Sequence, residues 1–108
     1  MAAASQSLEG RSLSVVTAVY NGEDSLAELC GRLGEVLARI AAQHEIILVN
    51  DGSRDRSWEI ISELSSRLPT VRGLCLMRNY GQHNALLCGI RAAKYDVRSE
   101  KAKGSKYT

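Results

Sequence analysis

The sequence lacks several features that would place a protein in a special class. Its 108 residues contain no phenylalanine and only one tryptophan, so any core has to be built from aliphatic side chains. The net charge of +2 is too small to indicate a nucleic-acid partner or binding to a membrane surface. No apolar run approaches the roughly 18 residues of a membrane-spanning helix, and the first residues do not resemble a signal peptide.

Cysteine is also scarce. Cys30, Cys75 and Cys88 are odd in number, and their wide spacing suits no common metal site. Free cysteines of this kind are usually small buried hydrophobic residues of proteins in a reducing compartment. The cysteines therefore predict a cytoplasmic location and no metal site.

One short segment carries a clear structural signal. Residues 46–49 are all aliphatic and lead directly into Asn50, Asp51, Gly52 and Ser53. A strand without polar alternation is typical of the interior of a sheet that is covered on both faces. Because ligands of open α/β sheets bind beyond the carboxyl ends of the strands, Asp51 should lie at the edge of a ligand crevice.

Strand patterns alternate with helical patterns along the chain. Aliphatic segments predict strands over residues 13–20, 44–50 and 71–77. Apolar residues spaced by three and four predict helices over residues 25–42, 57–68 and 84–94. The Asn21-Gly22 dipeptide also suits a hairpin turn, but the helical period after it argues against a hairpin. The alternation predicts an α/β fold with three parallel strands and three helices, in which the first strand is central.

The two ends of the chain depart from this pattern. Residues 1–12 have no sustained apolar core and are expected to form a disordered lead-in. Residues 97–108 are charged and lack apolar periodicity, so we expect a disordered tail there. The predicted domain therefore covers residues 13–96.

This architecture has two expected weaknesses. At least one edge of the sheet should be unpaired, and such an edge favours self-association. Gly31 and Gly34 should each weaken the first helix by about 1 kcal/mol relative to alanine, unless close packing uses their small size.

Three loops follow the three predicted strands, and in a parallel sheet all of them open at the same edge. Their candidate ligand-binding residues are Tyr20, Asn21, Asp51, Gly52, Ser53, Arg78, Asn79 and Gly81. This set suits a nucleotide, because an aromatic ring can stack on the base, a carboxylate can accept a ring N–H, and Arg78 can bind phosphate. The sequence has neither the G-x-G-x-x-G pattern of dinucleotide-binding folds nor a P-loop.

Taken singly, the three main signals also have simpler explanations. Asp51 could end the strand in an Asx-type turn, Tyr20 could be an amphipathic rim residue, and Arg78 could pair with a carboxylate. Only their convergence at one edge of the sheet indicates nucleotide binding.

Three segments carry a family resemblance in the same order and spacing. They read SVVTAVYNGEDSL, EIILVNDGSRDRS and LMRNYGQHNALLCGIRAA. Together they resemble the N-terminal half of a family 2 glycosyltransferase with the GT-A fold, over residues 13–96. The third segment is most similar to the polyisoprenyl-phosphate glycosyltransferases, a group that includes undecaprenyl-phosphate aminoarabinose transferase and dolichyl-phosphate mannose synthase.

The resemblance implies a role for each candidate residue. Tyr20, with Asn21 beside it, would lie against the nucleobase, and Asp51 would accept a hydrogen bond from the base, which is most commonly uracil. Gly52 and Ser53 would shape that pocket. The loop that carries Arg78, Asn79 and Gly81 would approach the diphosphate.

The chain departs from the family pattern after residue 96. In relatives, an Asp-x-Asp motif follows there and holds a divalent cation, Mg²⁺ or Mn²⁺, at the sugar diphosphate. The sequence contains no Asp-x-Asp, so it assigns no catalytic and no metal-binding residue in this chain.

The expected function is therefore that of a truncated enzyme. The intact enzyme would use a nucleotide-diphospho-sugar, most commonly a UDP-sugar, and transfer the sugar to a polyisoprenyl-phosphate or glycan acceptor at the cytoplasmic face of a membrane. This chain would be its nucleotide-binding part and inactive alone. The alternative is a non-catalytic UDP-binding or interaction remnant.

Overall fold

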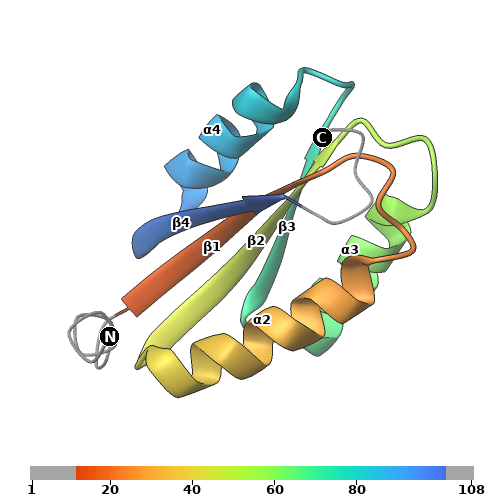
Figure 1. The fold of residues 1–108 in the computed structure, drawn as a ribbon. Coiled ribbons are helices and arrows are strands. Elements are labelled where there is room, and N and C mark those ends of the chain that lie inside the picture. Colours follow the sequence, from red (N-terminus) through yellow and green to blue (C-terminus); the bar gives the residue numbers. More distant parts are fainter. Residues whose placement is uncertain (1–11, 102–108) are drawn as a thin grey trace.

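The structure, a computed structural model, describes the backbone of residues 12–101 and the side chains of residues 12–95. Strands and helices alternate in the order β1 (Ser12–Val19), α2 (Leu26–Ile40), β2 (Gln43–Asp51), α3 (Ser57–Arg67), β3 (Val71–Leu76), α4 (Gln82–Ala92) and β4 (Asp96–Lys101) (Figure 1). The first six elements lie within two residues of their predicted bounds. The α/β fold with alternating parallel strands and helices is thus confirmed.

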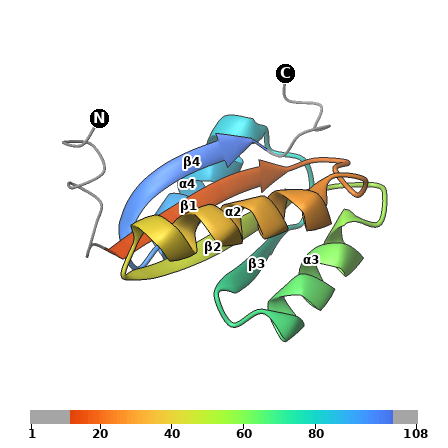
Figure 2. The same cartoon turned by 60° about the horizontal axis from the view of Figure 1, so that its bottom comes forward.

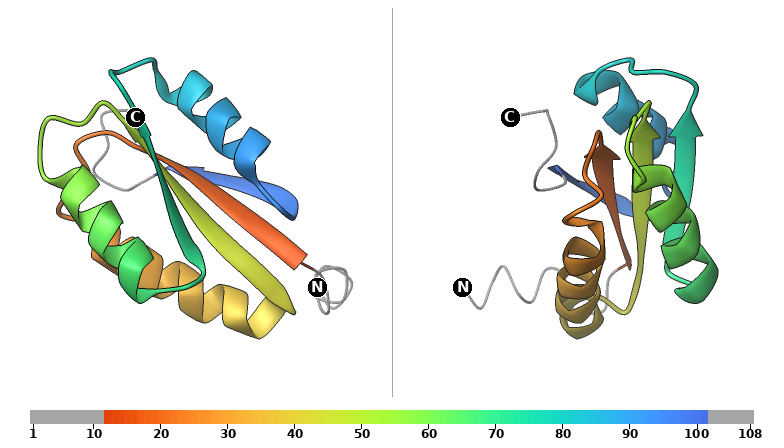
Figure 3. Two further views of the ribbon diagram at one scale, coloured as in Figure 1. Left: turned by 180° about the vertical axis from the view of Figure 1, so that it is seen from behind. Right: turned by 90° about the vertical axis from the view of Figure 1, so that its right-hand side faces the viewer.

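The four strands form one parallel sheet in the order β3-β2-β1-β4. Helices α2 and α3 cover one face of this sheet and α4 covers the other (Figures 2 and 3). Strands β1 and β2 are both interior, as their aliphatic composition predicts. The predicted central position of the first strand is confirmed.

Alternate residues of the interior strands enter two separate cores. Ile46 and Leu48 pack in the core under α2 and α3, whereas Ile47 and Val49 pack in the core under α4. All four side chains are almost completely buried. A strand with a core on each face has no solvent side, which explains why residues 46–49 show no polar alternation.

The fourth strand differs from the sequence-based expectation. Residues 97–101, assigned above to a charged tail, continue from Asp96 as β4 and pair with β1 from Leu13 to Ala18. The pairing uses backbone groups. A segment without apolar periodicity can therefore form a strand that its sequence pattern does not predict. The rest of the predicted tail, residues 102–108, and residues 1–11 of the lead-in lie outside the described residues, and Ser12 belongs to β1.

Two of the glycine expectations are resolved by the packing. A methyl group at Gly31 or Gly34 would meet nothing within 4 Å, so close packing does not use their small size. Gly89 is different, because a Cβ there would collide with Val16 and would press against Val49. This glycine lets α4 lie directly on the sheet.

Two further properties bear on partners. Within residues 12–101, β3 and β4 each pair on one side only, and the self-association expected from such an edge stays a prediction. None of the helices in the described part of the chain has the length and apolar character needed to cross a bilayer.

Candidate functional site

The loops after β1, β2 and β3 meet at the carboxyl edge of the sheet, above the strands (Figure 1). They comprise residues 20–25, 52–56 and 77–81. Hydrogen bonds join the second loop to the first, and Asp51 joins the end of β2 to the third. The convergence predicted from the sequence is therefore present in the structure.

Asp51 ends β2 and has no exposed surface. Its Oδ1 accepts the backbone N–H of Tyr80 at 2.7 Å, and its Oδ2 accepts the N–H of Gly81 at 2.9 Å. Asn79 Oδ1 also accepts the Gly81 N–H, at 2.9 Å. The carboxylate thus lies beneath the third loop and holds its backbone, rather than facing an open crevice.

Gly52 brings the second and third loops into contact. Its φ of +71° is a conformation that favours glycine, and a Cβ there would overlap the backbone of Arg78 and Asn79. The close approach of two backbones explains why glycine follows Asp51. Gly52 therefore shapes the site through the loop it contacts.

The third loop presents the exposed side chains of the site. Arg78 and Asn79 are exposed, and the Arg78 guanidinium lies 5.2 Å from the centre of the half-exposed Tyr80 ring. This is cation–π geometry. Arg78 has no carboxylate partner among the described side chains, so the alternative of a structural ion pair does not apply there.

The first loop is tied to the second through Asn21 and Ser53. Asn21 has a φ of +54°; its backbone N–H donates to Ser53 Oγ at 3.0 Å, and its Oδ1 accepts the Arg54 N–H at 2.9 Å. The Ser53 N–H donates in turn to Asn50 Oδ1 at 3.3 Å. Tyr20, just before Asn21, is only 7% exposed, so its ring is part of the core rather than an open stacking surface.

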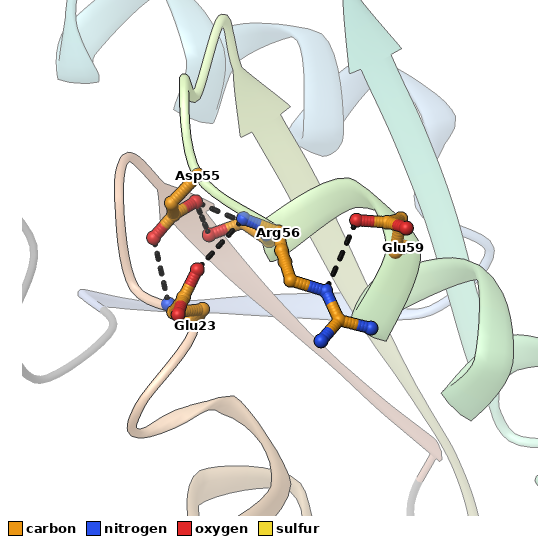
Figure 4. A network of polar contacts seen from close by, with 5 residues as sticks. Glu23, Asp55, Arg56 and Glu59 are labelled. Carbon is orange, nitrogen blue, oxygen red and sulfur yellow. Dashed lines mark hydrogen bonds and ion pairs between the residues drawn. The ribbon is translucent and has the colours of Figure 1, made fainter.

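A further set of contacts between these loops was missed by the sequence reasoning (Figure 4). Asp55 Oδ2 accepts the Glu23 N–H at 3.2 Å, and Glu23 Oε1 accepts the Arg56 N–H at 2.8 Å. Asp55 Oδ1 accepts both the N–H and the hydroxyl of Ser57, at 2.9 and 2.6 Å. The signal available in the sequence was the Asp-x-Ser at the start of the helix, which suits a capping turn.

The electrostatics of Asp55 follow from these contacts. Burial alone would raise the pKa of its carboxyl group, but hydrogen bonds from Ser57 and from the Glu23 N–H outweigh burial and hold that pKa below its ordinary value. Asp55 is therefore an ionised acceptor at neutral pH. Arg56 extends the network to an exposed pair with Glu59 at 3.3 Å.

Comparison with known proteins identifies the family of this chain. The model of the family described as "Glycosyl transferase family 2" matches residues 14–98. The chain belongs to glycosyltransferase family 2.

Curated proteins similar to this chain include two bacterial transferases. The chain is 45% identical over 86 residues to the undecaprenyl-phosphate 4-deoxy-4-formamido-L-arabinose transferase of Edwardsiella ictaluri, covering 79% of this chain and 26% of that protein. It is 44% identical over 87 residues to the protein of the same name from Pseudomonas fluorescens, covering 79% and 25%. The chain thus spans about a quarter of the length of the relatives it matches.

Solved structures share the fold of this glycosyltransferase chain. S. aureus TarS 1-349 in complex with UDP superposes with a TM-score of 0.70 at 20% identity, covering 84% of this chain and 27% of that one. The TarS structure described without UDP gives a TM-score of 0.69 with the same coverage. At this identity the likeness establishes a common fold.

The divalent cation implied by the family can be tested against the residues present. No three His, Cys, Asp or Glu side chains in the described part of this glycosyltransferase chain gather into a group that could hold a metal ion. Asp51, the carboxylate that ends β2, directs both oxygens at backbone N–H groups of the third loop. Both Asp51 oxygens are thus engaged by backbone donors, and the described side chains offer no cluster of three such metal ligands.

Proposed function

We propose that this chain forms the nucleotide-binding part of a glycosyltransferase that uses a UDP-sugar. Membership of family 2 supports a glycosyl donor, and the TarS structure with the same fold contains UDP. The observation that carries the proposal is the meeting of three loops at the carboxyl edge of the sheet, with the exposed cation of Arg78 beside them.

The candidate residues divide between the two ends of the nucleotide. Asn21, with Gly52 and Ser53 opposite, forms the base end, and the buried ring of Tyr20 supports this end from the core. Arg78, Asn79 and Gly81 form the diphosphate end, where a guanidinium can bind phosphate oxygens in a bidentate manner.

Asp51 also belongs to the base end, but its burial limits access of the base to its carboxylate. Each of its carboxylate oxygens accepts one loop N–H and retains capacity for a second hydrogen bond. Because the side chain has no exposed surface, a ring N–H of uracil reaches it only when the third loop shifts. Binding of the base to Asp51 therefore implies movement of that loop.

The proposed sugar acceptor is inferred from the names of the relatives, and it applies to proteins of their full length. Relatives that are 40–45% identical are named as transferases acting on undecaprenyl phosphate, and we propose a polyisoprenyl phosphate as the acceptor at the cytoplasmic face of a membrane. Among the described residues, no three His, Cys, Asp or Glu side chains form a group that could hold a metal ion. We therefore propose that the 108-residue chain binds UDP without transferring sugar.

Isothermal titration of the chain with UDP, with and without Mg²⁺ or Mn²⁺, tests the binding. We expect saturable binding that is indifferent to the metal ion. The Arg78→Ala variant should bind about tenfold more weakly, which corresponds to the roughly 1.5 kcal/mol of an exposed charge-assisted hydrogen bond. Arg39→Ala, which removes an exposed cation from the last turn of α2, is the matched control and should bind as the wild type does.

Two results would contradict these proposals. An absence of UDP binding to the wild-type chain would remove the nucleotide-binding function. Release of sugar from a UDP-sugar above the protein-free background, with Mg²⁺ or Mn²⁺ present, would disprove the proposed inactivity.

A further inference from the structure

Three consecutive backbone N–H groups in the loop after β1 donate to side chains of the loop after β2 and of Ser57, the first residue of α3. The N–H of Asn21 donates to Ser53 Oγ at 3.0 Å, and that of Gly22 donates to Ser57 Oγ at 3.0 Å. The N–H of Glu23 donates to Asp55 Oδ2 at 3.2 Å. The residues that follow Tyr20 are thus held by side chains that lie 32 to 35 positions later in the chain.

Asp55 controls two of these three contacts. It accepts the Glu23 N–H directly. It also accepts the Ser57 hydroxyl hydrogen at 2.6 Å, which leaves the Ser57 oxygen free to accept the Gly22 N–H. Ser57 has no exposed surface, so bulk water does not compete for its hydroxyl. The carboxylate of Asp55 therefore sets the direction of a hydrogen bond that it does not itself make.

Glu23 makes a second hydrogen bond between the two loops, with its side chain as the acceptor. Its Oε1 accepts the Arg56 N–H at 2.8 Å, while its own N–H donates to Asp55 (Figure 4). Each loop thus supplies one carboxylate to the backbone of the other. Two reciprocal bonds fix the separation of the loops and also their alignment along the strands.

We propose that Asp55 and Glu23 are positioning residues of the proposed nucleotide site. They lock the first loop to the second and so hold Tyr20 and Asn21 at the base end of the site, without touching the nucleotide themselves. The inference rests on the proposed function for its consequence in UDP binding. Its structural half, the ordering of the first loop, can be measured without any ligand.

The geometry distinguishes the two carboxylates chemically. Both oxygens of Asp55 accept hydrogen bonds, so Asp55→Asn replaces one acceptor with an NH₂ donor and must lose a bond. Glu23 uses one oxygen, which the amide oxygen of Glu23→Gln can replace. Exposed Asp24, in the same turn but outside these contacts, supplies a matched Asp24→Asn control.

Two measurements test the proposal on the full chain. Amide hydrogen exchange, without ligand, should be faster at residues 21–23 in Asp55→Asn and Glu23→Ala, while strand β2 keeps its protection. UDP affinity should fall about five- to tenfold in the same two variants, the effect of losing one or two hydrogen bonds. Glu23→Gln and Asp24→Asn should match the wild type in both measurements.

The outcomes separate the inference from the proposed function. Unchanged exchange at residues 21–23 in Asp55→Asn, or equal loss in Glu23→Gln and Glu23→Ala, would overturn the positioning role. Failure of the wild type to bind UDP would overturn the proposed function, and the exchange rates would still decide whether the carboxylates order the loop. If Asp55→Asn does not fold, the comparison of Glu23→Ala with Glu23→Gln gives the same decision.

Discussion

Glu45 is the buried charge on which we expect the fold to depend most. It lies in β2 near the amino edge of the sheet and is 4% exposed. One oxygen accepts from the Arg72 guanidinium at 2.8 Å, and the other accepts from the Ser14 hydroxyl and the Lys94 N–H, both at 2.7 Å. Ser14 Oγ also accepts the Tyr95 N–H at 3.1 Å, so Glu45 connects β1 and β3 with the turn that leads into β4.

The Glu45→Gln substitution keeps the size of the side chain and removes its charge. If the amide oxygen remains with Ser14 and Lys94, the NH₂ group faces the Arg72 guanidinium, donor against donor. Breaking a buried ion pair costs about 3–5 kcal/mol when one partner is removed. Because the Arg72 side chain is 35% exposed and can regain water, we expect a loss of free energy of unfolding below that range, about 2–3 kcal/mol.

The pH dependence of folding stability gives a second test of the role of Glu45. Burial alone would raise the pKa of Glu45, but the hydrogen bonds from Lys94, Ser14 and Arg72, and the Arg72 charge, hold it below its ordinary value. A depressed folded-state pKa gives stability that is present above the unfolded value, about pH 4.3, and is lost as the pH falls through the folded value. The difference between wild type and Glu45→Gln should therefore be largest near pH 7 and shrink below about pH 4.

Urea unfolding followed by circular dichroism measures the loss, and Glu28→Gln provides the control. Glu28 lies 2.7 Å from Arg32, as short a contact, but both side chains are more than half exposed. Exposed pairs within one helix contribute only about 0.3–0.5 kcal/mol, so Glu28→Gln should be nearly neutral. Equal effects of the two substitutions, or a Glu45→Gln penalty that does not change with pH, would refute the reasoning.

Three glycine substitutions should give three different results in the same unfolding assay. Gly31→Ala should stabilise the chain by about 0.5–1 kcal/mol, because alanine favours a helix and its methyl group meets nothing. Gly89→Ala should destabilise it by about 1–2 kcal/mol, since overpacking against Val16 exceeds the gain in helix propensity. Gly52→Ala should lose UDP binding, as measured by titration, because its methyl group would overlap the backbone of the third loop and its φ is positive. A stabilising Gly89→Ala or a fully binding Gly52→Ala would contradict the packing described here.

The elements with two buried faces were predictable from the sequence, and β4 was not. The aliphatic residues 46–49 require an interior strand because no other environment buries both faces. Residues 96–101 read DVRSEK and join the sheet through backbone pairing with β1. A charged strand at the edge of a sheet has no side-chain period that distinguishes it from a tail.

The site was predictable in its location but not in its internal bonding. The carboxyl edge follows from parallel strands, and the exposure of Arg78 agrees with the expectation of a cation there. The contact of Asp51 with the backbone of Tyr80 and Gly81 depends on how a loop 29 to 30 residues away folds back. The residue types of that loop do not predict its contact with Asp51, because the donors are backbone N–H groups.

Four carboxylates hold another segment of the chain by accepting its backbone N–H groups. Asp51 accepts N–H groups of the third loop, Asp55 that of Glu23, Glu23 that of Arg56, and Glu45 that of Lys94. A carboxylate that binds backbone N–H groups fixes a loop whatever side chains the loop carries. The conformation of the third loop is therefore set from below by Asp51, while its exposed side chains remain available to select the ligand.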